Sequence, residues 1–161
     1  MDSVMKESQR HHFGDITAMG RLADETVKLS DGSVIPKGAF TMVSLEKMRD
    51  DSIFTQPDEF IGSRFLKFRQ RPGQENKWHF VSTSPEHLTF GLGEHACPGR
   101  FFAGTEVMIA LCHLLLKYDW KLTKDGRKKD RLHDQIVNAN PTVTVLIKRR
   151  KQEASGYFFA F

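Results

Sequence analysis

The sequence predicts an α+β fold, mainly helical, and its 161 residues fit a single domain. Three observations lead to this class: an opening stretch without Gly or Pro, a long apolar run after residue 99, and short β-prone runs bounded by turn residues. Hydrophobic residues make up 39% and charged residues 27%, which argues against wholesale disorder. We assign residues 1–148 to this domain and expect residues 149–161, a basic and then aromatic tail, to be disordered.

Composition excludes several classes of protein. Two cysteines exclude a disulfide-stapled scaffold and a four-cysteine zinc site. The net charge of +4 is too small to imply a nucleic-acid partner. No apolar run reaches the roughly 20 residues of a membrane helix, and the opening residues show no signal-peptide pattern. We therefore expect a soluble chain with reduced cysteines.

The first predicted element is a helix over residues 2–12. Asp2 or Ser3 is placed to cap this helix, and Gly14 is placed to end it. Because the chain opens almost directly into the helix, we expect its start to be truncated.

A β-hairpin is predicted at residues 27–35, because two short β-branched runs flank an Asp31-Gly32 turn. Residues 39–44 predict another strand, and residues 45–49 predict one helical turn. An ordered loop is expected over residues 50–64, and a polar surface loop over residues 69–79.

The longest predicted element is a helix from Gly99 or Arg100 to Tyr118, about 27 Å long at 1.5 Å per residue. Its residues 107–116 are apolar nearly all round, apart from His113, and such a helix is expected to be buried. Residues 83–100 form a loop that feeds this helix. Residues 120–123 and 142–147 predict two strands around a charged connector.

The most informative segment is F-G-L-G-E-H-A-C-P-G-R, residues 90–100, in which Cys97 precedes the long helix. The start of a helix favours negative charge, such as that of a thiolate. Gly91, Gly93 and Gly99 allow the backbone to approach a flat ligand closely and to turn N–H groups toward the sulfur.

Two side chains of this loop complete a ligand site around Cys97. His95, two residues before the cysteine, can reach a negative group on the edge of the ligand. Phe90 supplies an apolar face beside the sulfur. A buried free cysteine in a glycine-rich turn is the alternative interpretation of the same residues.

Residues 90–99 resemble the haem-binding loop of the cytochrome P-450 monooxygenase family. Phe, two Gly, a basic residue, Cys and a further Gly stand in the order and spacing of the family. The resemblance implies that Cys97 is the proximal thiolate ligand of haem b and that His95 faces a haem propionate. Such a thiolate pushes electron density onto the iron and favours O–O cleavage.

A second arginine contact to the propionates is often found in the family, and Arg21 lies in that region of the sequence. The cofactor-binding residues implied by the resemblance are Arg21, Phe90, Gly91, Gly93, His95, Cys97 and Gly99. Residues 13–19 and 134–141 resemble two substrate-facing segments of the family, and they are ordinary loops in the alternative interpretation.

Glu7 and Arg10 stand three residues apart on the first helix and, taken alone, predict an exposed ion pair. In context they resemble the E-x-x-R motif of the family, whose third partner is an arginine before the cysteine loop. Arg64 fits that place, although Gly62 and Ser63 replace residues common in the family. The resemblance implies a buried salt-bridge network with a structural rather than catalytic role.

The resemblance covers Glu7 to about Lys148 and implies the C-terminal part of the cytochrome P-450 fold. That part contains the E-x-x-R helix, a small β-sheet, the cysteine loop, a long buried helix and a C-terminal β-hairpin. The helix that activates oxygen in the family lies elsewhere in the fold, so no catalytic residue is expected here. A missing N-terminal part of the same fold is an expected partner, and full-length relatives are usually anchored to the endoplasmic reticulum membrane.

The implied reaction inserts one atom of O₂ into an apolar small molecule and reduces the other to water. Electrons would come from NADPH through NADPH–cytochrome P-450 reductase. The local sequence style resembles fungal enzymes of terpenoid and other secondary metabolism. Two alternatives stay open: a catalytically inactive truncated remnant, and a small haem-thiolate peroxygenase or haem sensor that needs no reductase.

Overall fold

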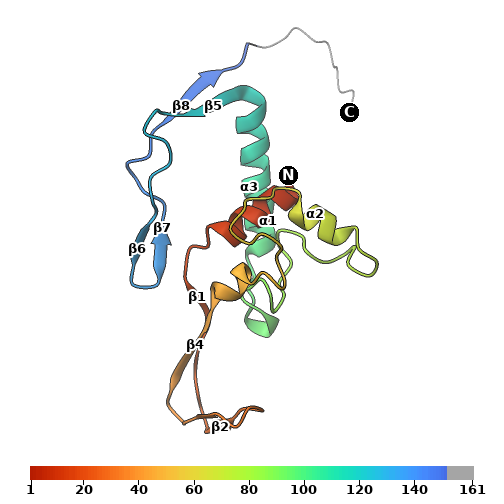
Figure 1. The fold of residues 1–161 in the computed structure, drawn as a ribbon, viewed down its shortest axis with the longest axis vertical. Helices are drawn as coiled ribbons and strands as arrows, with labels where there is room; N and C mark the ends of the chain where they lie inside the picture. Colours follow the sequence, from red (N-terminus) through yellow and green to blue (C-terminus); the bar gives the residue numbers. More distant parts are fainter. Residues whose placement is uncertain (152–161) are drawn as a thin grey trace.

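The computed structural model describes residues 1–151. Three α-helices and two short 3₁₀ helices form the centre of the molecule (Figure 1). They are α1 (Asp2–His11), α2 (Arg64–Arg69), α3 (Arg100–Lys117), η1 (Leu45–Arg49) and η2 (Gly93–His95). The helix predicted after residue 99 and the helical turn at residues 45–49 are thereby confirmed.

The strands form four separate antiparallel pairs that extend away from the helices (Figure 1). The pairs are β1 (Thr17–Leu22) with β4 (Phe40–Ser44), β2 (Val27–Lys28) with β3 (Val34–Ile35), β5 (Tyr118–Leu122) with β8 (Val145–Arg149), and β6 (Arg131–His133) with β7 (Ile136–Asn138). The β5–β8 ribbon carries the β6–β7 hairpin at its far end.

The predicted Asp-Gly turn forms as expected between β2 and β3. Gly32 adopts φ +90°, a conformation that glycine adopts at little cost, and the Asp31 carboxylate accepts a hydrogen bond from Ser33 N at 2.8 Å. Five elements were not predicted: β1, α2, η2 and the two strands of the β6–β7 hairpin. β1 is irregular, because its register with β4 shifts between Ala18 and Arg21.

The start of α1 differs from the prediction, because neither Asp2 nor Ser3 caps it. The Asp2 carboxylate instead accepts from Phe80 N at 3.0 Å and pairs with Arg69. Ser3 Oγ donates to Gly62 O at 2.6 Å and accepts from Leu66 N at 3.0 Å. These side chains therefore tie α1 to α2 and to the loop that follows it. The helix ends at His11, before Gly14.

Two small apolar clusters form the core beside α1. One contains Leu45, Met48 and Leu88, and Leu92 packs against it. The other consists of aromatic rings at centroid distances of 5.2 to 6.4 Å. Its rings are those of Phe54, Phe65, Phe68 and Trp78.

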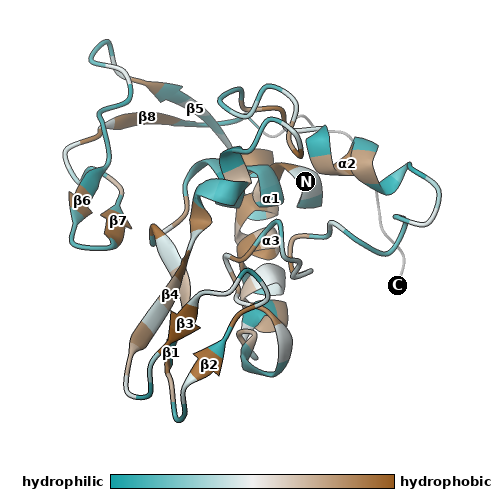
Figure 2. Cartoon of the chain, turned by 60° about the horizontal axis from the view of Figure 1, so that its bottom comes forward, coloured by the Kyte–Doolittle hydropathy of each residue, from teal (hydrophilic) through white to brown (hydrophobic). Residues whose placement is uncertain are grey.

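The prediction that α3 is buried is wrong for the described chain, in which Gly104 is its one buried residue. Ile109 is 63% exposed and Leu116 is 75% exposed. Figure 2 shows the hydrophobic colouring along this helix. An apolar sequence of this kind suits a helix that is packed on all sides, but residues 1–151 cover little of the surface of α3.

The C-terminal strand β8 extends to Arg149, beyond the predicted end of the domain at residue 148. Arg150 N also donates to Lys117 O at 2.8 Å, because the strand continues beside the end of α3. The rest of the predicted tail, residues 152–161, lies outside the described residues. Within residues 1–151, no helix is both long enough and apolar enough to cross a membrane.

Candidate functional site

A hollow of about 350 Å³ lies between β1 with the residues before it, the start of η1 at Leu45, and the loop before α3. We call it the cysteine hollow. Five of the predicted cofactor-binding residues line it, and these are Arg21, Phe90, Gly91, His95 and Cys97. Gly93 and Gly99 belong to the same loop but are not among the lining residues. Residues far apart in the sequence are thus brought to one place.

Cys97 is exposed and lies three residues before the start of α3. Its N–H donates to Phe90 O at 2.8 Å, which closes the loop on itself. Its carbonyl accepts a hydrogen bond from Arg100 Nη1 at 2.8 Å. The thiol is therefore accessible while the backbone around it is held from both sides.

Glycine is required at two turns of this loop. Gly91 and Gly93 have φ of +73° and +70°, which are strained for residues with a Cβ. A Cβ on Gly91 would also lie 3.4 Å from His95 O. At Gly99 a Cβ would lie 3.9 Å from Cys97 Sγ, so glycine leaves more room beside the sulfur.

The residues of the cysteine hollow fit a haem. An accessible sulfur, two basic side chains and an apolar ring are what an iron porphyrin with anionic propionates requires. Arg21 extends from β1, where its Nη1 donates to Gly20 O at 2.7 Å. Arg21 and His95 are the two basic residues that line the hollow with Cys97.

Glu7, Arg10 and Arg64 form a buried network beside α1. Arg10 donates to both carboxylate oxygens of Glu7, at 2.9 and 3.0 Å, and Arg64 Nε donates to Glu7 Oε1 at 3.0 Å. Burial alone would raise the pKa of Glu7, but hydrogen bonds from Arg10, Ile61 N and Arg64 hold it below its usual value.

The two arginines also bind carbonyls of the loop that surrounds them. Arg10 Nη1 donates to Met48 O at 2.8 Å, and Arg64 Nη2 donates to Glu59 O at 3.0 Å. Met48 packs against Leu88, which lines the cysteine hollow. The network is therefore connected to the wall of the hollow through Met48 and Leu88.

A larger hollow of about 890 Å³ adjoins the cysteine hollow, and Phe13 and Thr17 line both. Both segments predicted to face substrate contribute to it, through Phe13 and Ile16 from the first and Val137 from the second. Backbone hydrogen bonds join the segments, from Ile16 N to Gln135 O at 2.9 Å and from Val137 N to Gly14 O at 2.7 Å.

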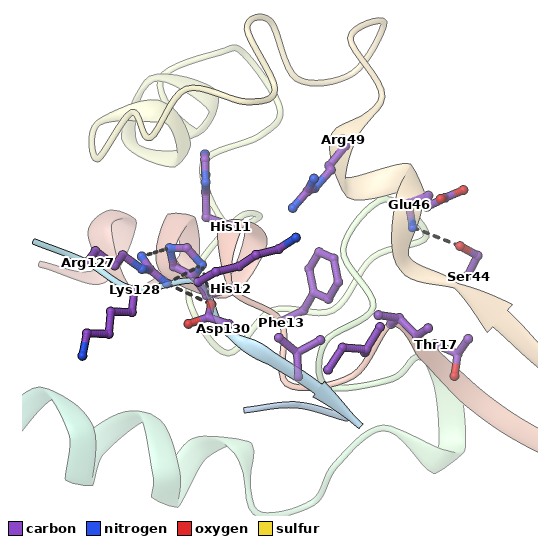
Figure 3. Close-up of a pocket in the computed structure, with 14 residues that line it drawn as sticks. His11, His12, Phe13, Thr17, Ser44, Glu46, Arg49, Arg127, Lys128 and Asp130 are labelled. Carbon is purple, nitrogen blue, oxygen red and sulfur yellow. Dashed lines mark hydrogen bonds and ion pairs between the residues drawn. The ribbon is translucent and has the colours of Figure 1, made fainter. Parts of the chain in front are cut away.

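Arg127, Lys128 and Asp130 lie together beside His12 on one side of this larger hollow, and Arg49 and Glu46 line another side (Figure 3). Arg127 contacts both ring nitrogens of His12, at 2.6 and 3.1 Å, and donates to Asp130 Oδ2 at 3.0 Å. Burial and then the Arg127 charge lower the pKa of His12. The lowered pKa favours the neutral ring, which is the form that can accept a hydrogen bond from Arg127.

Two buried polar side chains were missed by sequence reasoning. Lys6 is 1% exposed, and His87 has the same exposed fraction. Burial lowers the pKa of His87 to about 3, and its Nδ1 lies 3.2 Å from Thr89 Oγ1. Lysine is usually exposed and histidine is intermediate, so the sequence carried no pattern that would have marked these two residues as buried.

The chain resembles known proteins over nearly its whole length. The family model described as Cytochrome P450 matches residues 1–147. The chain is 47% identical over 155 residues to "Cytochrome P450 monooxygenase olcG" of Penicillium canescens, covering 96% of this chain and 31% of that protein. It is 49% identical over 158 residues to "Cytochrome P450 monooxygenase adrA" of Penicillium rubens, covering 96% of this chain and 30% of that protein.

Among solved structures, retinoic acid bound cyanobacterial CYP120A1 matches with a TM-score of 0.71 at 20% identity, over 92% of this chain and 33% of that one. This likeness shows the fold, and the chain spans about a third of the length of the relatives named here. The resemblance drawn from the cysteine loop is confirmed: the chain belongs to the cytochrome P450 family and adopts part of the cytochrome P450 fold.

Proposed function

We propose that the cysteine hollow binds haem b and that Cys97 is the thiolate ligand of its iron. The observation that carries this proposal is the accessible Cys97 thiol in a hollow that it shares with His95 and Arg21. The start of α3 favours the negative charge of the sulfur. In this proposal His95 and Arg21 pair with the two propionates.

The chain's own residues bind and orient the cofactor in this proposal. The hydrogen bond from Cys97 N to Phe90 O fixes the loop, and the glycine turns leave space for a flat ring. Glu7, Arg10 and Arg64 stabilise the wall of the hollow and take no part in the chemistry. When bound, haem would supply the activation of O₂ in a monooxygenation.

The whole protein is proposed to oxidise an apolar small molecule, with electrons from NADPH delivered by NADPH–cytochrome P-450 reductase. Fungal relatives that carry the name monooxygenase support this proposal, and secondary metabolism is the setting we infer. Phe13, Ile16 and Val137 offer an apolar surface for the substrate beside the cysteine hollow.

A second candidate is a polypeptide that binds haem but does not oxidise substrate. Two observations favour it for these 161 residues taken alone: α3 is largely exposed, and the chain spans about a third of its relatives. Haem binding and substrate oxidation must therefore be measured separately.

The first experiment adds haemin to the chain, reduces it, and records the carbon monoxide difference spectrum. We expect the red-shifted Soret band of thiolate ligation, and its loss in Cys97→Ser. Cys112→Ser is the matched control, because Cys112 lies within α3, and it should keep the band. Absence of the band in the unaltered chain, or its survival in Cys97→Ser, would overturn the proposed ligand.

Turnover distinguishes the two candidates once haem is bound. A chain that shows the thiolate band and consumes NADPH with reductase, in step with oxidation of an added terpenoid, is a monooxygenase. A chain with the band and no oxidation is the haem-binding polypeptide of the second candidate.

A further inference from the structure

A third hollow, of about 720 Å³, lies between α1, the loop of residues 74–86 and the start of α3. We call it the lysine hollow, because Lys6 lines it. It shares none of its lining residues with the cysteine hollow. Its walls carry three cationic side chains and one carboxylate, which are Lys6, Lys77, Arg100 and Glu86.

Lys6 is a buried cation with spare donors. Its side chain is almost wholly removed from water, and its Nζ donates to Ser82 O at 2.8 Å. That carbonyl is the one hydrogen-bond acceptor that contacts the ammonium within residues 1–151, although an ammonium has three donors. The ammonium also lies 5.6 Å from the centre of the Phe65 ring.

The charge of Lys6 is incompletely balanced at this position. Burial lowers its pKa to about 7, the Asp2 carboxylate partly opposes this effect, and the Arg69 charge adds to it. Asp2 is itself engaged by Arg69 and by Phe80 N. An additional negative charge beside Lys6 would therefore stabilise its protonated form.

Two further donors in the same hollow are unpaired. Arg100 Nε and Ser84 Oγ are buried and have no hydrogen-bond partner in the part of the chain that the structure describes. Buried polar atoms nearly always have a partner, so each of these calls for an acceptor. The guanidinium is held in place, because Nη1 donates to Cys97 O at 2.8 Å and the group lies 4.3 Å from the Phe101 ring centre.

We propose that the lysine hollow binds a small oxyanion, a phosphate or carboxylate group, through Lys6 Nζ, Arg100 Nε and Ser84 Oγ. An oxyanion has several acceptor lone pairs and a negative charge, which suit an ammonium, a guanidinium N–H and a hydroxyl as donors. Trp78 and Phe101 add flat apolar walls that suit an organic part attached to the anion. Its lining residues are distinct from those of the cysteine hollow, although Arg100 also donates to Cys97 O.

The test follows the fluorescence of Trp78, which lines the hollow, in a Trp120→Phe background that leaves it as the one tryptophan. Inorganic phosphate and, separately, acetate replace chloride at constant ionic strength and pH 6.5. We expect a saturable change with at least one of the two, and the preferred anion identifies the group that the site takes.

Variants then assign the effect to the hollow. Lys6→Met should weaken binding about tenfold or more, because a charged donor is lost, whereas Lys67→Met, at an exposed position on α2, should leave it unchanged. Ser84→Ala removes a hydroxyl without altering the packing and should weaken binding several-fold. Near-ultraviolet circular dichroism checks that each variant is folded.

Two results would overturn the proposal. One is a response to both anions that does not saturate. The other is saturable binding that is as tight in Lys6→Met and Ser84→Ala as in the parent chain, which would mean an adventitious ion only.

Discussion

Glu7 places one carboxylate between two arginines, and the side chains of all three residues are at most 3% exposed. Their charges are tolerated because each is paired and because the spare guanidinium donors reach backbone carbonyls. Removing one partner leaves the others charged and incompletely paired. The cost of such a change is far larger than for an ion pair on the surface.

Arg10→Ala is expected to lower the free energy of unfolding by about 3–5 kcal/mol, because it leaves the buried Glu7 with one of its two arginine partners. Arg127→Ala breaks an ion pair between the half-exposed Arg127 side chain and Asp130. This substitution should change the free energy of unfolding by less than about 1 kcal/mol. Urea unfolding followed by circular dichroism measures both. Equal effects of the two substitutions would show that the buried network does not stabilise the fold.

Lys6 makes stability depend on pH in a defined direction. Its pKa of about 7 in the folded chain lies below the ordinary value of 10.5, so between these values the unfolded chain holds one more proton. Stability therefore rises with pH over this range. The gain should be about 2 kcal/mol between pH 7 and pH 9.

Comparison with Lys6→Met isolates this contribution, because other titrating groups are common to both chains. The free energy of unfolding of the unaltered chain should rise relative to that of Lys6→Met between pH 7 and pH 9. A constant difference over this range would mean that Lys6 has an ordinary pKa in the folded state.

At the scale of secondary-structure elements, α3 has an apolar sequence typical of a buried helix, but most of its side chains are exposed. Its apolar side chains face solvent on several sides, and Ile109 and Leu116 stand seven residues apart on one face. An apolar face of this kind favours association. We expect these 161 residues on their own to self-associate.

The double substitution Ile109→Glu and Leu116→Glu should reduce this self-association in sedimentation velocity with little change in the free energy of unfolding. It also lowers the net charge from +4 to +2, which alone would favour association. The matched control, Gln70→Glu with Asn76→Asp at exposed positions, changes the charge equally and should not reduce association. A similar reduction in the control would remove α3 as the cause.

The elements that sequence predicts correctly are those determined locally. The Asp31-Gly32 turn specifies the β2–β3 hairpin, and the uninterrupted run after residue 99 specifies α3. β1 depends on pairing with β4 about 20 residues later and contains an irregular register, so its local pattern is weak. α2 is a six-residue helix that forms because Phe65 and Phe68 pack on Phe54.

At the scale of the whole molecule, motif resemblance indicated which residues share a hollow better than residue patterns did. Cys97, His95 and Phe90 were placed in one loop by spacing, and Arg21 was added by family position; all four line one hollow. The lysine hollow was not predicted, because it is assembled from α1, a long loop and α3, which have no local relation in sequence. The unpaired donors of Arg100 and Ser84 can be recognised only in the folded structure, because their lack of a partner depends on contacts between elements.

The long-range ties of α1 have a consequence for the order in which the chain folds. Glu7 pairs with Arg64, which lies 57 residues later in the chain. Lys6 donates to the carbonyl of Ser82, which lies 76 residues later. During synthesis the charges of α1 therefore remain in water until their partners, 57 and 76 positions later, have also been made. Such late closure slows folding, and it makes α1 late to become protected although it is made before its partners.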